Sequence, residues 1–276
     1  MTVCIAAICD NGATAVAASD RMLQATYPPI EFEHTKPKIH YLSKYCIALT
    51  AGDALKPIEI IPDCILTIEN QKKSPQIKQI VEIVKSWYQL SRLSRVEEQF
   101  LKPRTISIQT FYEKGMRILP IDIFGYLDKE ITSYDYGLQL MVVGGDDSGA
   151  HIYALYNPGI ANCYDTISFH AIGIGQLYAM EKFVAQKYSS SCELTECLNV
   201  VYAAKKAAEA APGVGKETDI SIIDKNQAIM VDDAIIQQLE SIYATVTGPR
   251  QEEIQKAKGL LEALLKDRKG GDNNGT

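Results

Sequence analysis

The chain opens with the stretches Val3-Cys-Ile-Ala-Ala-Ile8, Asp10-Asn-Gly12 and Ala13-Thr-Ala-Val-Ala-Ala18. The first stretch is a short apolar run and the third is a run of small residues, as expected for two buried strands. The Asp-Asn-Gly step between them is a hairpin-turn signal, because these residues tolerate the backbone conformations that tight turns require. The sequence therefore predicts that the chain begins as a β-hairpin.

Beyond the hairpin, strands and helices come in blocks, in the order strands, helices, strands, helices, strands, helix. Two antiparallel sheets flanked by helix layers satisfy this order, whereas a parallel doubly wound sheet would require regular alternation. The predicted fold is therefore α+β, a four-layer αββα sandwich of two antiparallel sheets. A polar, proline-bearing loop is predicted over 24–37. Further strands are predicted over 38–42, 45–50, 138–143, 151–156, 163–170, 218–223 and 227–231, and helices over 54–70, 74–100, 175–188, 194–211 and from 235 onward.

Three of these segments carry more specific predictions. The helix over 54–70 contains Pro57 and Pro62, so it is expected to be kinked or divided. The helix over 74–100 is amphipathic, and Ser74-Pro75 is predicted as its cap and first turn. The segment 102–135 has mixed character. A strand is predicted over 105–111, and the remainder resembles an insertion or edge structure to which no function is assigned.

One domain is predicted over 1–250, because the sequence contains no internal repeat and no linker that would separate two domains. An amphipathic C-terminal helix is predicted over 251–266. The last residues, 267–276, are polar and rich in glycine, so a disordered tail is predicted there.

Composition narrows the function classes. The chain has 34 acidic against 28 basic residues, so it has no basic field for binding nucleic acid. No apolar run of membrane-spanning length and no signal peptide is recognisable, so a cytoplasmic protein without a membrane partner is expected. The seven cysteines lack CxxC spacing and are expected to be reduced, and the four histidines lack metal-ligand spacing. No cofactor or metal is expected.

Thr2 is a candidate nucleophile because of the polar residues expected near it. It begins the first strand, its hairpin partner ends in Ala17-Ala-Ser-Asp-Arg21, and Lys38 opens the next strand. A hydroxyl, a free amine, a carboxylate and an ammonium group can then meet at one end of a sheet. That combination suits a threonine hydroxyl activated by its own N-terminal amine. By themselves, a threonine at position 2 and a lysine at a strand end more often have no catalytic role.

Seven short landmarks follow in order: Thr2-Val-Cys-Ile-Ala6, Gly12, Ala17-Ala-Ser-Asp-Arg21, Lys38-Ile39, Thr50-Ala-Gly-Asp-Ala54, Val143-Gly-Gly-Asp146 and Ile172-Gly-Ile-Gly175. Together they resemble the landmarks of proteasome β-type subunits, within the N-terminal-nucleophile hydrolase superfamily, over about four fifths of the chain. The resemblance implies the αββα fold of those hydrolases, self-assembly into a ring or helix, and amide hydrolysis by an N-terminal threonine. No propeptide precedes Thr2, so the pattern is most similar to bacterial members that mature by removal of Met1.

The resemblance also implies roles for individual residues. Thr2 corresponds to the nucleophile and Lys38 to the lysine beside it. Gly52 lies 14 residues after Lys38, the family's step to the glycine whose backbone N–H stabilises the oxyanion. The family's acidic partner aligns with either Ser19 or Asp20. Asp20 is preferred because strand side chains alternate, and the two extra residues before it can be absorbed in the hairpin turn without changing its face.

Two departures from the family leave the activity open. Ile174 stands where the family has a serine that assists the N-terminal amine, and the segment Ala211-Pro-Gly-Val-Gly215 lacks the family's aspartate and serine. The leading hypothesis is a threonine peptidase or amide hydrolase that assembles with copies of itself. The alternatives are an inactive self-assembling scaffold of the same fold and a small-molecule amidohydrolase. Whether an ATP-dependent unfoldase acts with it is not assigned.

Overall fold

The opening hairpin forms the middle of a five-stranded antiparallel sheet in the computed structural model, which describes residues 2–25, 30–33 and 38–247. Cys4 lies opposite Ser19 and Cys9 opposite Thr14, so the Asp-Asn-Gly turn joins neighbouring strands as predicted. The strand order is β10-β1-β2-β11-β12. The bounds are β1 (Val3–Cys9), β2 (Thr14–Asp20), β10 (Phe169–Gly173), β11 (Thr218–Ile223) and β12 (Ala228–Met230), with η1 (Asp10–Gly12) in the turn.

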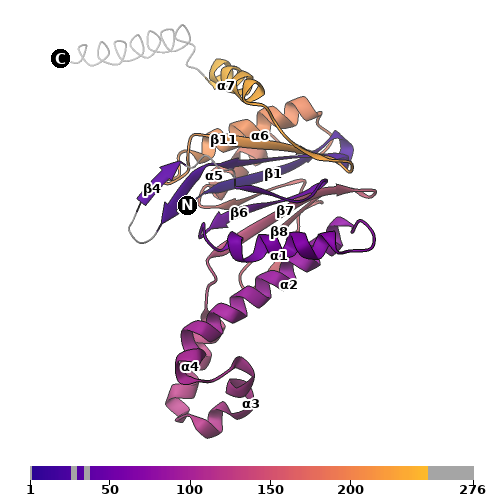
Figure 1. Cartoon of the computed structure of the whole chain (residues 1–276). Helices are drawn as coiled ribbons and strands as arrows, with labels where there is room; N and C mark the ends of the chain where they lie inside the picture. Colours follow the sequence, from indigo (N-terminus) through magenta and orange to yellow (C-terminus); the bar gives the residue numbers. More distant parts are fainter. Residues whose placement is uncertain (1, 26–29, 34–37, 248–276) are drawn as a thin grey trace, which may run out of the picture.

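A second five-stranded antiparallel sheet faces the first (Figure 1). Its order, β5-β6-β7-β8-β9, follows the chain, so each strand pairs with its sequence neighbour in this sheet. The prediction of an α+β protein with two antiparallel sheets is confirmed. The bounds are β5 (Ile39–Ser43), β6 (Cys46–Gly52), β7 (Leu138–Asp146), β8 (Gly149–Tyr156) and β9 (Ile160–Cys163).

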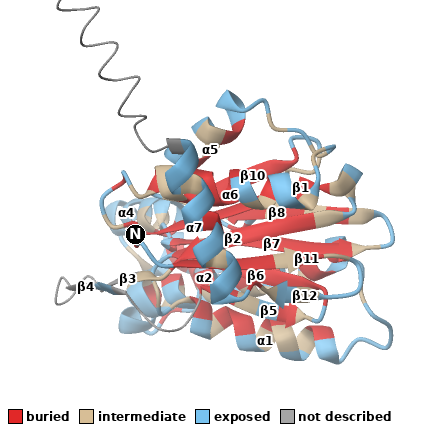
Figure 2. Cartoon of the chain, turned by 90° about the horizontal axis from the view of Figure 1, so that it is seen from above, coloured by how far each residue is buried: buried red, intermediate tan, exposed pale blue. Residues whose placement is uncertain are grey.

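Alternating side chains of β1 belong to two different cores, which explains why this strand has no polar residue. Val3 and Ile5 pack with the helices α5 and α6, whereas Cys4 and Ala6 pack against strands of the second sheet. A third core lies between the second sheet and the helices α1 and α2. The strands accordingly form the most buried part of the molecule (Figure 2). The helices are α1 (Pro57–Glu69), α2 (Ile77–Val96), α5 (Gln176–Ala185), α6 (Leu194–Ala208) and α7 (Asp233–Thr247).

The loop predicted over 24–37 is wrong in part. Two short strands, β3 (Met22–Ala25) and β4 (Ile30–Glu33), pair antiparallel within it. The prolines at positions 28 and 29, which suggested the loop, lie outside the described residues. The strand predicted over 163–170 is also displaced, because β9 ends at Cys163 and β10 begins only at Phe169.

The helix predicted over 54–70 is one undivided helix that begins at Pro57. Pro57 occupies the first turn, where the missing N–H is not needed. Pro62 lies inside the helix, yet the helix continues to Glu69. The buried side chains on either side of Pro62, Ile61 and Cys64 among them, pack in the core of the second sheet and offset the lost hydrogen bond.

The start of α2 also differs from the prediction. The helix begins at Ile77 rather than with Ser74-Pro75, and Gln76 is its N-cap. The side-chain Oε1 of Gln79 accepts a hydrogen bond from Gln76 N at 2.9 Å, and Asp146 Oδ2 accepts one from Ile77 N at 3.0 Å. A carboxylate from the second sheet thus satisfies a backbone N–H of the first turn, which a local sequence pattern does not reveal.

The strand predicted over 105–111 is wrong, because this region is helical. Ser107 caps a helix by accepting a hydrogen bond from Thr110 N at 3.1 Å, and the rings of Phe111 and Phe124 stack with centroids 4.7 Å apart. The region folds into two helices, α3 and α4, which form a small core of their own and project from the sheets at the end of α2 (Figure 1). The elements are η2 (Glu97–Leu101), η3 (Lys102–Arg104), α3 (Ile108–Ile118) and α4 (Ile121–Ser133).

The remaining expectations concern the termini and the cysteines. The helix predicted over 251–266 and the tail predicted over 267–276 lie outside the described residues. All seven cysteines are free thiols. Among the helices of the described ranges, none combines the length and the apolar character needed to cross a membrane.

Candidate active site

The four residues singled out in the sequence lie at the ends of strands. Thr2 precedes β1, Asp20 is the last residue of β2, Lys38 precedes β5, and Gly52 is the last residue of β6. The first two belong to one sheet and the last two to the other. Because the sheets pack face to face, these ends meet at one edge of the molecule.

Lys38 connects the two sheets at this edge. Its Nζ donates hydrogen bonds to Thr2 Oγ1 and to Asp20 Oδ1, the second at 2.9 Å. All three residues are buried: Thr2 is 3% exposed, Asp20 0% and Lys38 6%. An unpaired ammonium group at such a depth would cost several kcal/mol, and the ion pair with Asp20 offsets that cost.

Asp20 is held by hydrogen bonds on both carboxylate oxygens. Oδ1 accepts from Val3 N at 3.0 Å as well as from Lys38, and Oδ2 accepts from Met22 N at 3.1 Å and Gly215 N at 2.9 Å. Four donors therefore orient one buried carboxylate. Ser19, the alternative acidic-partner position, is buried opposite Cys4, and its Oγ has no hydrogen-bond partner within the described part of the chain. The structure thus brings Asp20, not Ser19, to Lys38.

Gly52 occupies a position that requires glycine. Its φ is +108°, and an added Cβ would lie 2.3 Å from the carbonyl oxygen of Gly137. On either side of Gly52, Asp53 N donates a backbone hydrogen bond to Gly137 O and Thr50 N donates one to Lys38 O. Since N–H directions alternate along a strand, the Gly52 N–H points away from β7, towards the side from which Lys38 enters.

A cavity of about 490 Å³ opens beside Thr2 and is lined by both sheets. One wall comes from the chain that follows α4, where Asn157 Oδ1 accepts hydrogen bonds from Tyr136 N at 3.1 Å and Arg92 Nε at 3.2 Å. The helical insertion therefore returns to the candidate site and completes it. A larger cavity, of about 850 Å³, lies among α5, α6 and α7 and does not touch Thr2. The cavity beside Thr2 is lined by Thr2, Gly52, Asp135, Gly137, Leu138, Gln139, Tyr156, Asn157, Gly173 and Ile174.

The segment around Ile174 supports Thr2 through its backbone. An added Cβ at Gly173 would lie 2.3 Å from Thr2 O, and Gly175 N donates to the same oxygen at 3.4 Å. Ile174 is 49% exposed and lines the cavity, where its side chain offers no hydrogen bond.

The second departure, 211–215, also contributes backbone rather than side chains. Gly215 N donates to Asp20, and the loop is held from behind by Lys205, whose Nζ donates to Lys216 O and to Glu209 Oε1. Burial lowers the pKa of Lys205 below its usual value, although Glu209 opposes this effect. Lys205 is fully buried beneath the candidate site.

Three contributors were not identified from the sequence: Gln139, Gly215 and Lys205. A signal existed for Lys205, which follows Val201 by four residues and precedes Ala208 by three on an alanine-rich helix, and so lies on the buried face. Gln139 and Gly215 carry no local signal, because their neighbours in the site come from distant parts of the chain.

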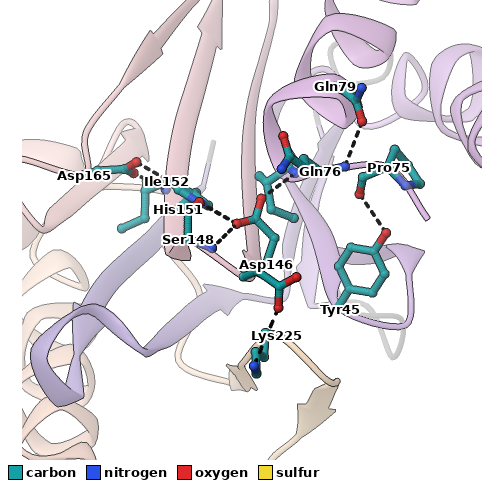
Figure 3. Close-up of polar contacts among 12 residues, drawn as sticks. Tyr45, Pro75, Gln76, Gln79, Asp146, Ser148, His151, Ile152, Asp165 and Lys225 are labelled. Atoms are coloured by element: carbon teal, nitrogen blue, oxygen red, sulfur yellow. Dashed lines mark hydrogen bonds and ion pairs between the residues drawn. The ribbon is translucent and has the colours of Figure 1, made fainter. Parts of the chain in front are cut away.

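A second polar cluster lies at the other end of β7 and β8 (Figure 3). Asp165 Oδ2 is 2.7 Å from His151 Nδ1, and His151 Nε2 is 2.9 Å from Ser148 Oγ, which resembles a serine, histidine and aspartate triad. However, Ser148 Oγ donates to Asp146 Oδ1 at 2.6 Å. The hydrogen bond and charge of Asp165 raise the pKa of His151, and Asp146 adds a smaller effect in the same direction. The two carboxylates favour the charged imidazole, which cannot take the serine proton, and Ser148 already donates that proton to Asp146, so this cluster is better suited to holding the turn.

The comparisons with known proteins add no assignment. No protein-family model matches the chain, and none of the curated proteins matches it. Within the described ranges, no group of three or more histidine, cysteine, aspartate or glutamate side chains is arranged to hold a metal ion.

Proposed function

We propose that this chain is a threonine-type hydrolase of the proteasome β kind, which cleaves peptide or other amide bonds with Thr2 as its nucleophile after removal of Met1. The observation that carries the proposal is the buried Lys38 ammonium group, which hydrogen-bonds both Thr2 Oγ1 and the carboxylate of Asp20 beside an open cavity. A buried charge that contacts a hydroxyl at a cavity is more typical of a catalytic site than of a structural ion pair.

The packing order supports the four-layer αββα arrangement of N-terminal-nucleophile hydrolases. The helices α5 and α6 pack on one sheet, α1 and α2 pack on the other, and the two sheets share a core. In this arrangement the first residue of the first strand reaches the space between the sheets. Thr2 has the same strand parity as Cys4 and Ala6, whose side chains belong to that shared core.

The proposed reaction begins with the hydroxyl oxygen of Thr2 adding to the amide carbonyl carbon, while its proton passes to the α-amine. The electron pair of the carbonyl bond moves to oxygen, where the N–H of Gly52 stabilises the negative charge. Collapse expels the leaving amine, which takes the proton from the α-ammonium group and leaves an ester on Thr2. Water then adds to the ester carbonyl carbon and gives a proton to the α-amine. The α-ammonium group returns that proton to Thr2 Oγ1 as the carbon–oxygen bond breaks, which releases the acid and regenerates the free threonine.

Lys38 acts through its charge in this mechanism. A positive group close to the α-amine disfavours a second positive charge there, so it favours the unprotonated amine that can accept a proton. Asp20 orients Lys38 and keeps it charged, and the four donors on Asp20 keep that carboxylate in place.

A non-catalytic scaffold of the same fold is the second candidate. It is favoured by Ile174, which lines the cavity with an apolar side chain, and by the absence of acidic or hydroxyl side chains from 211–215. A small-molecule amidohydrolase would use the same residues as a peptidase. The choice between those two depends on which amides the cavity accepts.

Self-association is proposed for both functions. The helices on the outer layers carry exposed apolar side chains, including Leu177 (75%) and Val184 (67%) on α5 and Leu90 (55%) on α2. Such side chains are suited to contacts between copies of the chain. Light scattering over a wide range of protein concentrations tests this, and a stable monomer throughout would contradict it.

The decisive experiment exposes the purified chain to a peptide epoxyketone and measures its intact mass. The Thr2 hydroxyl adds to the ketone and the α-amine opens the epoxide, so the protein gains the whole probe once. We expect Met1 to be absent and the single adduct to map to Thr2, with no adduct on Thr2→Ala. A chain that retains Met1, or an adduct found only on cysteine, would favour the scaffold.

A further inference from the structure

The polar side chains that line the cavity differ in how many of their hydrogen-bonding groups are already used. Asn157 accepts two hydrogen bonds at Oδ1 and donates through Nδ2 to Tyr134 O at 3.2 Å. The hydroxyl of Tyr156 lies 2.5 Å from His170 Nε2. Asp135 accepts a hydrogen bond from Gly137 N and, as a carboxylate, has no proton to donate. Tyr156 and Asp135 have no side-chain N–H, and Asn157 keeps one of its two N–H groups on an amide that already makes three hydrogen bonds.

Gln139 is different. Its Oε1 accepts a hydrogen bond from Gly173 N at 2.9 Å, whereas Nε2 makes no hydrogen bond within the described part of the chain. The orientation of the amide follows from this contact, because the Gly173 N–H requires an acceptor and so turns the oxygen towards it. On the cavity wall Gln139 therefore presents two side-chain N–H groups, where Asn157 presents one.

The position of Gln139 brings this donor close to Thr2. Met141 and Val143, which have the same parity on β7, lie in the core between the sheets, so the Gln139 side chain also enters that space. Its partner Gly173 is in contact with Thr2, since an added Cβ there would meet the Thr2 carbonyl at 2.3 Å. Gln139 thus connects β7 to β10 across the opening of the cavity and is held from both sheets.

We propose that Gln139 is a substrate-binding residue, which donates a hydrogen bond from Nε2 to a carbonyl oxygen of the bound amide. The proposal rests on the function proposed above, because it assigns an amide to the cavity beside Thr2. An amide carbonyl is a strong acceptor and complements a donor that is fixed in place before the substrate arrives. The contact to Gly173 supplies that fixation, since it leaves the Gln139 amide little freedom to rotate.

The test compares the rate of epoxyketone labelling of Thr2 in the full chain with that of Gln139→Glu. The variant has the same shape and keeps an acceptor for Gly173 N, but near pH 8 it presents a carboxylate oxygen where the donor was. We expect labelling to slow by about tenfold to a hundredfold. The loss should shrink as the pH falls towards about 5, because a protonated carboxyl donates a hydrogen bond again.

Two further variants complete the test. Gln139→Met removes the donor at every pH, so its labelling rate relative to the wild type should stay low without recovery. Gln237→Glu makes the same chemical change on an exposed turn of α7 and should label like the wild type. Thermal unfolding of each variant verifies that the fold is intact.

The outcomes separate the two proposals. Absence of labelling at Thr2 in the wild type would overturn the proposed function, and this inference with it. If the wild type is labelled at Thr2, two results would overturn the inference alone. One is a labelling rate of Gln139→Glu equal to that of the wild type. The other is a slower rate of Gln139→Glu that does not recover at low pH.

Discussion

The two polar clusters at opposite ends of β7 and β8 contain similar groups and differ in what those groups can do. In one, the Thr2 hydroxyl accepts a hydrogen bond from Lys38, which leaves its own proton uncommitted. In the other, Ser148 gives its proton to Asp146 at 2.6 Å. The nine residues of β7 separate the clusters by about 27 Å. Residue types alone therefore do not identify a nucleophile. The direction of each hydrogen bond is what favours Thr2 over Ser148 as the proposed nucleophile.

Burial also differs between the clusters. Thr2, Asp20 and Lys38 are almost completely shielded from water, and Thr2 lines a cavity, whereas Ser148 lies exposed on a turn. A charge in a shielded site acts strongly on its neighbours, and the same charge on a surface is screened. The predictions below test this contrast, beginning with the largest expected effect.

Lys38→Ala should reduce epoxyketone labelling of Thr2 by about a hundredfold or more, because it removes the charge that acts on the α-amine. Asp20 would keep three backbone N–H donors, so we expect the chain to fold with a stability loss of about 2 to 4 kcal/mol. Labelling kinetics and urea unfolding measure the two effects. Lys44→Ala, an exposed lysine on the neighbouring turn, is the matched control, and labelling within threefold of the wild type in Lys38→Ala would contradict the role.

Gly52→Ala should destabilise the chain by about 1 to 3 kcal/mol and slow the labelling, because the new Cβ at φ +108° meets Gly137 O. The matched control is Gly125→Ala in α4, where an added Cβ meets no atom within 4 Å. Alanine there should stabilise the helix by about 0.5 to 1 kcal/mol. Urea unfolding of both variants checks the contrast, and equal stabilities would contradict the strain at Gly52.

The second cluster should make stability depend on pH near neutrality. Asp165 and Asp146 raise the pKa of His151, so folding favours its charged form. This contribution is fully present below the unfolded-state pKa of about 6.5 and is lost as the pH rises through the higher folded-state value. The carboxylates stay charged in that range. Burial raises the pKa of Asp146, but hydrogen bonds from Ser148 and Ile77 outweigh this effect and lower it to about 2. Burial likewise raises the pKa of Asp165, and the hydrogen bonds from His151 and Ile152 lower it below its usual value.

Unfolding of the wild type and of His151→Gln between about pH 5.5 and 8.5 tests the contribution of His151. The stability difference between the two proteins should be largest at the acid end of this range and should decrease towards the alkaline end. A difference that stays constant, or that grows with pH, would contradict a charged clamp at the turn.

The smallest effect is expected for Ser148→Ala. The variant loses hydrogen bonds on an exposed turn, so stability should change by no more than about 1 kcal/mol. Labelling of Thr2 should remain within about twofold of the wild type. A large loss of hydrolysis in this variant would show that the second cluster, rather than Thr2, carries the activity.

Elements that depend on interactions between nearby residues were predicted correctly, and elements that depend on more distant residues were not. The opening hairpin was readable because two short runs and a turn signal lie within eighteen residues. The predicted strand over 105–111 failed because α3 is stabilised by the cap at Ser107 and by the stacking of Phe111 on Phe124. The paired strands β3 and β4 were missed because prolines between them suggested a loop.

The sequence by itself predicted the hairpin and the two-sheet α+β composition, and its resemblance to proteasome β-type subunits singled out Thr2, Asp20, Lys38 and Gly52 as residues to examine. Strand alternation is a local property, so the preference for Asp20 over Ser19 followed from counting residues. Only the tertiary structure decided that Lys38 hydrogen-bonds Thr2 and Asp20, that Gly215 completes the shell around Asp20, and that Gln139 is fixed by Gly173. These contacts join residues up to 195 positions apart, so they depend on how the two sheets pack, which no local pattern encodes.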